Sequence, residues 1–158
     1  MSPKLHCLRP ETDLGAHEEQ PRGCQTSASG DPLAAEPSGG LATILVVDDE
    51  EGIRQLFKEV LVDAGYEVVL AGNGSEALKI LRGRNVHLVI TDILMPETEG
   101  IEMIRTVRRS FPGLRTIAVS GAFDGQYLRI ARLLGARAAL AKPVSPTQLL
   151  GAVREVLA

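Results

Sequence analysis

From residue 41 onward, the chain alternates short apolar runs with segments of helical periodicity. Five runs occur, at residues 43–47, 67–71, 86–91, 115–120 and 138–141. Most are nearly continuous in apolar side chains, as expected for parallel strands that are buried on both faces. Each run is followed by a helical pattern, so the sequence predicts five β–α units in an open, doubly wound parallel sheet. An eight-fold barrel would need more units than the chain holds.

The expected helices have recognisable boundaries. The second begins after Asn73, and the fifth begins after Ser145 with Pro146 at its first position. The third ends at residues 111–113, and the fourth runs from about residue 124 to 134, before Gly135. The first helix carries its apolar residues on one face and ends at Gly65. That face comprises Ile53, Leu56, Phe57, Val60, Leu61 and Ala64.

The first 40 residues have a different composition from the rest. They are rich in Pro, Gly and Ser and contain no aromatic residue. Such a segment buries too little apolar surface to offset its ordering entropy, so we expect residues 1–40 to be a disordered tail and residues 41–158 to be one domain. The tail also holds both cysteines, Cys7 and Cys24, so no disulfide is expected in the domain.

The charge of the chain bears on its possible partners. The net charge of −3 comes from the acids of the tail, and the domain itself is neutral. A neutral domain has no net attraction for a phosphate backbone, so direct binding to nucleic acid is not expected. The sequence shows neither a signal peptide nor an apolar run of membrane-spanning length. We therefore expect a cytoplasmic protein without a membrane partner.

Charged and hydroxyl side chains stand at the ends of four of the five expected strands. They are Asp48 and Asp49 after the first run, Asp92 after the third, Ser120 at the end of the fourth and Lys142 after the fifth. The carboxyl ends of parallel strands meet at one edge of a sheet, where the ligands of open α/β sheets bind. The sequence therefore predicts that three acids, a hydroxyl and a base gather at this edge.

This combination of side chains suits phosphoryl transfer. Clustered carboxylates repel one another unless a cation joins them, and Mg²⁺ prefers oxygen ligands. An aspartate can also act as a nucleophile that forms an acyl phosphate. Lys142 would supply a compact positive charge and Ser120 a hydroxyl donor for the oxygens of the transferred group. We therefore expect an aspartyl phosphate site with Mg²⁺ as cofactor.

Taken together, these residues resemble the receiver domain of two-component response regulators. The resemblance covers residues 41–158 and implies a (βα)5 flavodoxin-like fold with strand order 2-1-3-4-5. It rests on Asp48-Asp49 after an apolar strand, on Asp92 with Met95-Pro96 and Gly100, on Ser120 after Ile-Ala-Val, and on Lys142-Pro143.

The resemblance implies the phosphoacceptor and the metal ligands. Asp92 would accept the phosphoryl group from a histidine kinase or a histidine phosphotransfer protein. Asp49, Asp92 and the backbone carbonyl of Leu94 would bind Mg²⁺ directly, and Asp48 would act through water. The domain would catalyse only its own phosphorylation and dephosphorylation, so it would not be an enzyme in the ordinary sense.

Further roles follow from the same resemblance. Lys142 would bind the phosphoryl group, Ser120 would be the switch hydroxyl, and the peptide bond between Lys142 and Pro143 would be cis. We also expect no effector domain after the domain that resembles a receiver. The expected protein is therefore a single-domain regulator whose output passes by protein contact, through the face of the fourth helix, fifth strand and fifth helix.

The sequence departs from the family pattern at Ala139. Three residues before the lysine, the family usually has an aromatic side chain that turns inward on activation. A methyl group cannot make that rotation, so the coupling of Ser120 to an aromatic rotamer is in question. Phe123 and Tyr127, which follow Ser120, are the alternative carriers of the signal.

Three other functions fit parts of the sequence. A haloacid-dehalogenase-like phosphatase also uses an aspartyl nucleophile and Mg²⁺, but its two acids stand two residues apart, whereas Asp48 and Asp49 are adjacent. A phosphorylation-independent interaction module would not need the full set of charged residues. Residues 72–77 fit a dinucleotide-binding fingerprint with Asp92 downstream. A dinucleotide site would leave Asp48, Asp49 and Lys142 without a role.

Overall fold

The computed structural model describes residues 41–96, 99–121 and 125–158. The expected disordered tail and Phe123 lie outside these residues, so both stay predictions. Within the described part, no helix combines the length and the apolar character that crossing a membrane requires.

The described residues form five strands, and all of them lie in one parallel sheet. They are β1 (Thr43–Val47), β2 (Glu67–Ala71), β3 (Leu88–Asp92), β4 (Arg115–Ser120) and β5 (Ala138–Ala141). The strand order is β2-β1-β3-β4-β5, which confirms the predicted topology. Because β1 lies between β2 and β3, the strand order reverses beside it, and the ends of β1 and β3 flank the place where ligands of such sheets bind.

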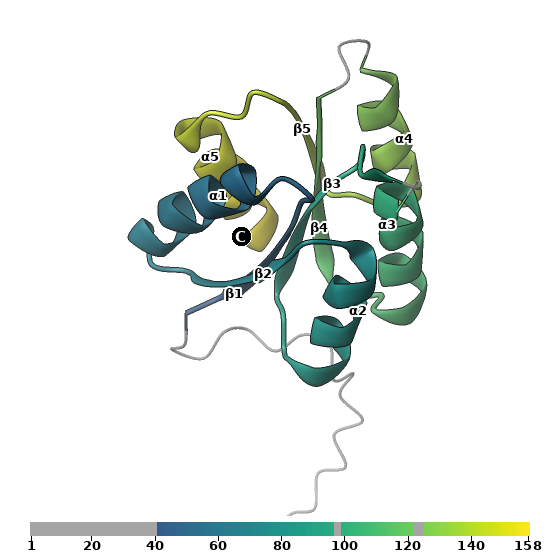
Figure 1. Cartoon of the computed structure of the whole chain (residues 1–158), viewed down its shortest axis with the longest axis horizontal. Coiled ribbons are helices and arrows are strands. Elements are labelled where there is room, and N and C mark those ends of the chain that lie inside the picture. Colours follow the sequence, from purple (N-terminus) through teal and green to yellow (C-terminus); the bar gives the residue numbers. More distant parts are fainter. Residues whose placement is uncertain (1–40, 97–98, 122–124) are drawn as a thin grey trace, which may run out of the picture. The chain divides into compact units, whose positions relative to one another are not determined.

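The part of the chain that the structure describes forms five helices, which cover the two faces of the sheet (Figure 1). One face carries α1 (Glu51–Asp63) and α5 (Pro146–Leu157), and the other carries α2 (Gly74–Gly83), α3 (Glu99–Ser110) and α4 (Gln126–Leu134). This two-sided cover explains why β1 and β3 are buried along their whole length and why their sequences are almost continuously apolar.

Local sequence accounts for several of the helix ends. The Asn73 side chain accepts a hydrogen bond from the Glu76 amide at 2.8 Å, and Ser145 forms a capping box with Gln148. Gly135 ends α4 in the left-handed conformation, with φ of 109°. The predicted start of α4 was wrong by two residues. The helix begins at Gln126 because Gly125, with φ of 68°, cannot be part of it.

The third strand begins two residues later than predicted and includes Asp92. His87 precedes the strand, and its ring nitrogen Nδ1 accepts a hydrogen bond from the Thr43 amide at 3.0 Å. The His87 amide in turn donates to the Thr43 carbonyl at 2.9 Å. His87 therefore packs against the start of β1 and has a structural role at the edge opposite the acidic residues.

Among the residues whose placement is described, the buried apolar side chains form three clusters. The α1/α5 core joins those helices to the sheet and includes Phe57, Leu61, Ile90, Leu149 and Val153. The α2/α3 core includes Leu45, Val47, Leu81, Met103 and Val107. The α3/α4 core comprises Ile93, Ile104, Ala118, Ala131 and Ala136, with Ile101, Tyr127, Leu128, Leu134 and Ala139 packed against it.

The predicted apolar face of α1 was too wide. Phe57 and Leu61 are buried, but Leu56 is 45% exposed and Ala64 is also exposed. Leu56 precedes Phe57 by one residue and therefore lies about 100° away around the helix, at the flank of the buried face. Ala64 is the C-cap residue, beyond the last full turn of the helix.

Candidate functional site

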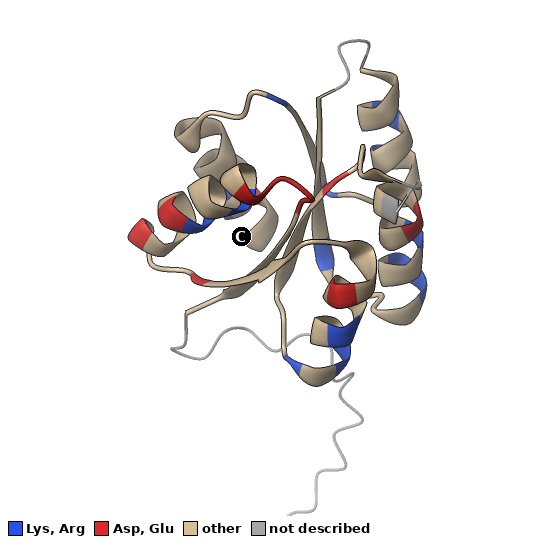
Figure 2. Cartoon of the chain, viewed as in Figure 1, with Lys and Arg blue, Asp and Glu red and all other residues tan. Residues whose placement is uncertain are grey.

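Three carboxylates meet where β1 and β3 end. Asp48 and Asp49 directly follow β1, and Asp92 is the last residue of β3. The two strands are paired in register, with Val47 opposite Thr91, so their ends lie side by side. One carboxylate oxygen from each acid lies within 4.8 Å of the others. Figure 2 shows acidic residues at the ends of both strands.

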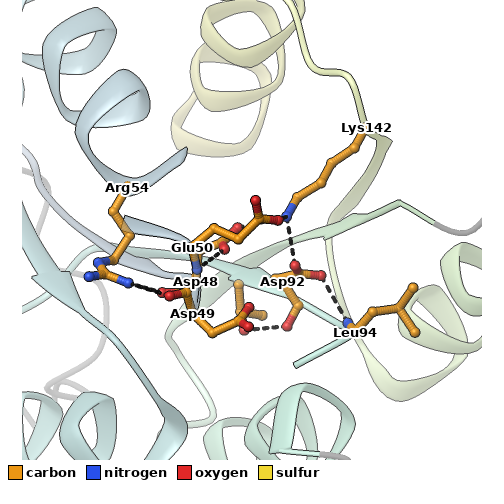
Figure 3. Close-up of polar contacts among 8 residues, drawn as sticks. Asp48, Asp49, Glu50, Arg54, Asp92, Leu94 and Lys142 are labelled. Carbon is orange, nitrogen blue, oxygen red and sulfur yellow. Dashed lines mark hydrogen bonds and ion pairs between the residues drawn. The ribbon is translucent and has the colours of Figure 1, made fainter. Parts of the chain in front are cut away.

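The Lys142 ammonium lies between two of these acids (Figure 3). Its Nζ atom is 2.7 Å from Asp92 Oδ2 and 2.9 Å from Asp48 Oδ2. Lys142 follows β5, and β5 pairs with β4 rather than with β1 or β3. Its long side chain therefore reaches back across the end of β4 to contact the acids. The sequence predicts only that Lys142 and the acids share one edge of the sheet.

Asp48 is held on both of its carboxylate oxygens and is almost fully buried. Oδ1 accepts the Glu50 amide at 2.9 Å, while Oδ2 accepts the Lys142 ammonium. Burial raises the pKa of the Asp48 carboxyl, and the nearby charge of Asp92 adds to this effect. The hydrogen bonds from Lys142 and the Glu50 amide oppose the shift without cancelling it. Negative charge at Asp48 is thus only partly compensated by the protein.

Lys142 shows the opposite balance. Burial by itself lowers the pKa of its ammonium, but the hydrogen bonds and charges of Asp92 and Asp48 outweigh burial, and the net pKa is raised. The ammonium therefore stays charged at neutral pH. It is a fixed cation that faces the Asp92 carboxylate.

The Asp92 carboxylate is oriented from two sides. Besides the contact of Oδ2 with Lys142, Oδ1 accepts the Leu94 amide at 2.9 Å. Asp92 itself is almost fully buried, with 5% of its surface exposed. Leu94, the predicted source of a backbone carbonyl ligand, is adjacent to the acids, and the residue is 42% exposed.

Ser120 and Pro143 take their predicted places at the same edge. Ser120 ends β4 and is fully buried, and its carbonyl accepts the Lys142 amide at 2.8 Å. The bond between Lys142 and Pro143 is cis, as the family resemblance implies. The structure thus brings every predicted site residue to one edge of the sheet, while the role of each stays a prediction.

Two residues near the acids were missed by the sequence analysis. Glu50 carries a carboxylate 3.8 Å from Lys142 Nζ, although its side chain is 67% exposed. Arg54, on the first turns of α1, donates from Nη1 to the carbonyl oxygens of Asp48 and Asp49 at 2.6 and 3.0 Å. Both residues follow the acidic pair closely in the sequence, and this proximity could have identified them as candidates. Helical spacing alone does not show that the Arg54 side chain turns back toward the loop.

The acidic cluster has the chemistry of a site for a hard divalent cation. Its donors are all carboxylate oxygens, and among the described residues no hydrogen bond or ion pair engages the Asp49 carboxylate. Mg²⁺ is commonly held by one or two carboxylates together with water. An ion there would also offset the charge that Lys142 leaves uncompensated. The residues present therefore fit Mg²⁺.

The turn that resembles a dinucleotide fingerprint is occupied by its own side chains. The Gly72 amide donates to Glu76 Oε2 at 2.8 Å, and the Glu76 amide donates to Asn73 Oδ1. A pyrophosphate would have to displace both acceptors and would meet the Glu76 carboxylate. The geometry therefore argues against dinucleotide binding at this turn.

Comparison with known sequences gives a consistent result. The family model for the response regulator receiver domain matches residues 44–154. The sensor kinase CckA of Brucella abortus is 36% identical over 120 residues, which are 75% of this chain and 13% of that protein. The regulatory protein PhoP of Bacillus subtilis, named for alkaline phosphatase synthesis, is 36% identical over 118 residues, or 72% of this chain and 48% of that protein. The chain spans less than half of either relative.

Solved structures share the fold. A CheY-like receiver domain protein from Methanospirillum hungatei superposes with a TM-score of 0.70 at 33% identity, covering 75% of this chain and 94% of that one. The response regulator TrrA from Thermotoga maritima, solved in complex with Mg²⁺ and BeF, gives a TM-score of 0.67 at 34% identity, covering 73% of this chain and 99% of that one.

Proposed function

Because the chain belongs to the response regulator receiver domain family, we propose that it accepts a phosphoryl group on Asp92 in a two-component phosphorelay. The observation that supports this most directly is the placement of the Lys142 ammonium 2.7 Å from Asp92 Oδ2, beside two further acids. A transferred phosphoryl group brings negative charge to this carboxylate oxygen. A cation that is fixed beside the oxygen compensates that charge.

The proposed reaction moves one phosphoryl group. A carboxylate oxygen of Asp92 attacks phosphorus, a new O–P bond forms as the bond from phosphorus to the donor breaks, and the leaving group keeps the electron pair of that bond. The carboxylate enters the reaction without a proton, so no general base is required. Lys142 and the Leu94 amide orient the nucleophile, and Lys142 and Ser120 are the proposed donors to the phosphoryl oxygens.

Asp48, Asp49, Asp92 and the Leu94 carbonyl are the proposed groups that hold Mg²⁺, Asp48 through water. When bound, the ion would neutralise charge on the transferring group and on the carboxylates. Among the described residues, Lys142 is the one cation that forms ion pairs with Asp48, Asp92 and the more distant Glu50. Its single positive charge does not neutralise these carboxylates.

The proposed donor is a histidine kinase or a histidine phosphotransfer protein. The proposed output is contact with a downstream protein through the face formed by α4, β5 and α5, in the cytoplasm.

We propose no direct contact with nucleic acid, since the basic residues of the domain are balanced by acidic residues. Residues 1–40 are proposed as a tail outside this exchange and residues 41–158 as the receiver domain.

The test is phosphorylation by acetyl phosphate in the presence of Mg²⁺, read by intact mass. The wild type should gain one phosphoryl group, and Asp92→Asn should gain none. Asp63→Asn, at an exposed acid near the end of α1, is the matched control and should label like the wild type. Labelling of Asp92→Asn at the wild-type level would remove Asp92 from its proposed role.

The phosphatase alternative predicts a different outcome. A phosphatase of that class would steadily release phosphate from many small phosphomonoesters. The adjacent placement of Asp48 and Asp49, with Asp48 bound to Lys142, favours the receiver function. We therefore expect no multiple-turnover phosphate release from phosphomonoesters by the wild type.

A further inference from the structure

The loop that carries the two acids is held by a residue outside the proposed metal site. Arg54, on α1, donates from Nη1 to the Asp48 carbonyl at 2.6 Å and to the Asp49 carbonyl at 3.0 Å. Figure 3 shows the guanidinium on the far side of this loop from Lys142. One side chain thus binds the main chain of both acids.

These two hydrogen bonds constrain where the acidic side chains can point. With both carbonyl oxygens directed to Arg54, the peptide units on either side of Asp49 have a fixed orientation. The Glu50 amide, next in the chain, is then placed to donate to Asp48 Oδ1 at 2.9 Å. Glu50 at the start of α1 provides no side-chain cap, so Arg54 adds to the other contacts that hold the loop, namely the Asp48 amide with the Ala71 carbonyl and the Asp48 carboxylate with Lys142.

Arg54 is itself fixed by its surroundings. It is half-buried, and its guanidinium lies against Gly72 at the end of β2, where a Cβ atom would meet Nη1 at 3.7 Å. Its amide donates to the Glu50 carbonyl at 3.1 Å, within the first turn of α1. The guanidinium therefore ties the loop after β1 to α1 and lies close to Gly72.

We propose that Arg54 is a positioning residue that preorganises Asp48 and Asp49 for Mg²⁺ by fixing their carbonyl groups. The inference rests on the proposed function, because it concerns the same metal. Residues that orient metal ligands without touching the metal change metal affinity by about 10- to 100-fold when they are replaced. Replacing Arg54 should therefore weaken Mg²⁺ binding by about tenfold.

Charge alone predicts the opposite sign. Arg54 is a cation near the site of a second cation, so its removal should tighten Mg²⁺ binding if it acted only through Coulomb repulsion. A role limited to stability would lower the melting temperature and leave the affinity of the folded protein unchanged. The direction of the change in Kd thus separates the three possibilities.

The experiment is a Mg²⁺ titration of the full chain at constant ionic strength and pH 7, followed by amide NMR shifts. Arg54→Met removes the donors and keeps the aliphatic stem, and Lys58→Met is the matched control, since it removes an exposed cation one turn further along α1. Arg54→Met should raise the Kd about tenfold and accelerate hydrogen exchange at the Glu50 amide. Arg54→Lys, whose ammonium can still donate to a carbonyl, should give an intermediate Kd.

Each outcome has one meaning. A Kd for Arg54→Met equal to or below that of the wild type, with the wild type binding Mg²⁺, overturns the role of Arg54 alone. If Arg54→Met does not fold, a wild-type Kd for folded Arg54→Lys with no change at Glu50 overturns it as well. A wild type that binds no Mg²⁺ overturns the proposed function and this inference with it.

Discussion

Lys142 is the residue on which the charge balance of the site depends. Its ammonium is within 4.0 Å of the carboxylates of Asp48, Asp92 and Glu50, and in the described part of the chain no other cation has an ion pair with these acids. One positive charge cannot offset Asp48, Asp49 and Asp92 together. The carboxylates of the site therefore repel one another, and a bound divalent cation would reduce this repulsion.

Mg²⁺ is accordingly expected to stabilise the folded domain. A ligand that binds only the folded state raises the free energy of unfolding by about 2.7 kcal/mol at a concentration 100 times its Kd. Thermal unfolding followed by circular dichroism should show a higher melting temperature with Mg²⁺ for the wild type and no such rise for Asp49→Asn. Asp63→Asn should keep the rise. An equal rise in Asp49→Asn would mean that Asp49 does not hold the metal.

The lifetime of the phosphoryl group is a second property set by single residues. Leu94 lies two residues after Asp92 and presents an apolar side chain that is 42% exposed beside the acids. Ala122, a second apolar residue that follows Ser120 by two positions in the sequence, lies outside the described residues. An apolar side chain cannot align a water molecule for attack on phosphorus, so we expect slow autodephosphorylation.

The lifetime can be measured after rapid removal of the phosphodonor, by intact mass against time. The wild type should keep its phosphoryl group for many minutes, and Leu94→Asn, which adds a polar group at the same place, should shorten the lifetime. Leu94→Met keeps an apolar side chain and should behave like the wild type. A wild-type lifetime of seconds would contradict the expectation.

The residues of the site differed in how well they could be predicted. Asp48, Asp92, Ser120 and Lys142 follow from sequence because their positions at strand ends are fixed by the parallel architecture. Arg54 does not, because its contact requires a long side chain to turn back over a loop, and several rotamers are compatible with its helix position.

At the scale of elements, the first turn of α3 lies very close to the backbone at the end of β3. A Cβ atom on Gly100 would lie 2.6 Å from both Cα and the carbonyl oxygen of Ile93, and it would also clash with the carbonyl oxygen of Asp92. The start of α3 therefore approaches the end of β3 more closely than any residue with a side chain allows. Gly100 was noted in the sequence only as part of a motif, whereas its physical role is this close approach.

Gly100→Ala is therefore expected to destabilise the domain by about 1–3 kcal/mol, as overpacking in a filled interior does. The matched variant is Gly151→Ala in α5, where a Cβ atom would meet nothing within 4 Å. It should stabilise by up to about 1 kcal/mol, because Ala favours a helix over Gly. Urea unfolding of both variants measures the two effects. Equal stability of the two variants would show that the close approach at Gly100 is easily relaxed.

Helix faces were predicted less accurately than helix ends. Asn73 and Ser145 cap their helices as expected, because capping depends on a few neighbouring atoms. Leu56 was assigned to the buried face of α1 but is exposed, since the width of a buried face depends on how the neighbouring helix and sheet pack against it. Periodicity identifies the direction of that face and leaves its flanks undetermined.

At the scale of the whole domain, the α3/α4 core connects the proposed phosphoryl site with α4. It begins at Ile93, next to Asp92, passes Ala118 of β4, and reaches Ala131 and Tyr127 of α4. Ala139 of β5, the residue that replaces the usual aromatic, packs against the same core. Among the described members of this core, Tyr127 supplies the one aromatic ring, so a change at Asp92 that moves β4 or α4 should alter the packing of that ring.

We therefore predict that phosphorylation changes the environment of Tyr127. Tyr66 and Tyr127 are the two tyrosines of the chain, and Tyr66 packs against the α1/α5 core on the opposite face of the sheet. Protein labelled with 3-fluorotyrosine should give one ¹⁹F signal from each, with the Tyr127 signal shifting on phosphorylation and the Tyr66 signal unchanged. Tyr127→Phe identifies the signal, and Asp92→Asn treated with the same phosphodonor should show no shift.

The result distinguishes the routes by which the domain could respond without an aromatic side chain at Ala139. A shift at Tyr127 alone places the response in the α3/α4 core, because the label on the other face reports no change. Equal shifts of both signals would indicate a rearrangement of the whole sheet. If neither signal moved on full phosphorylation, the ring of Tyr127 would take no part, and the response would have to pass through side chains outside this core.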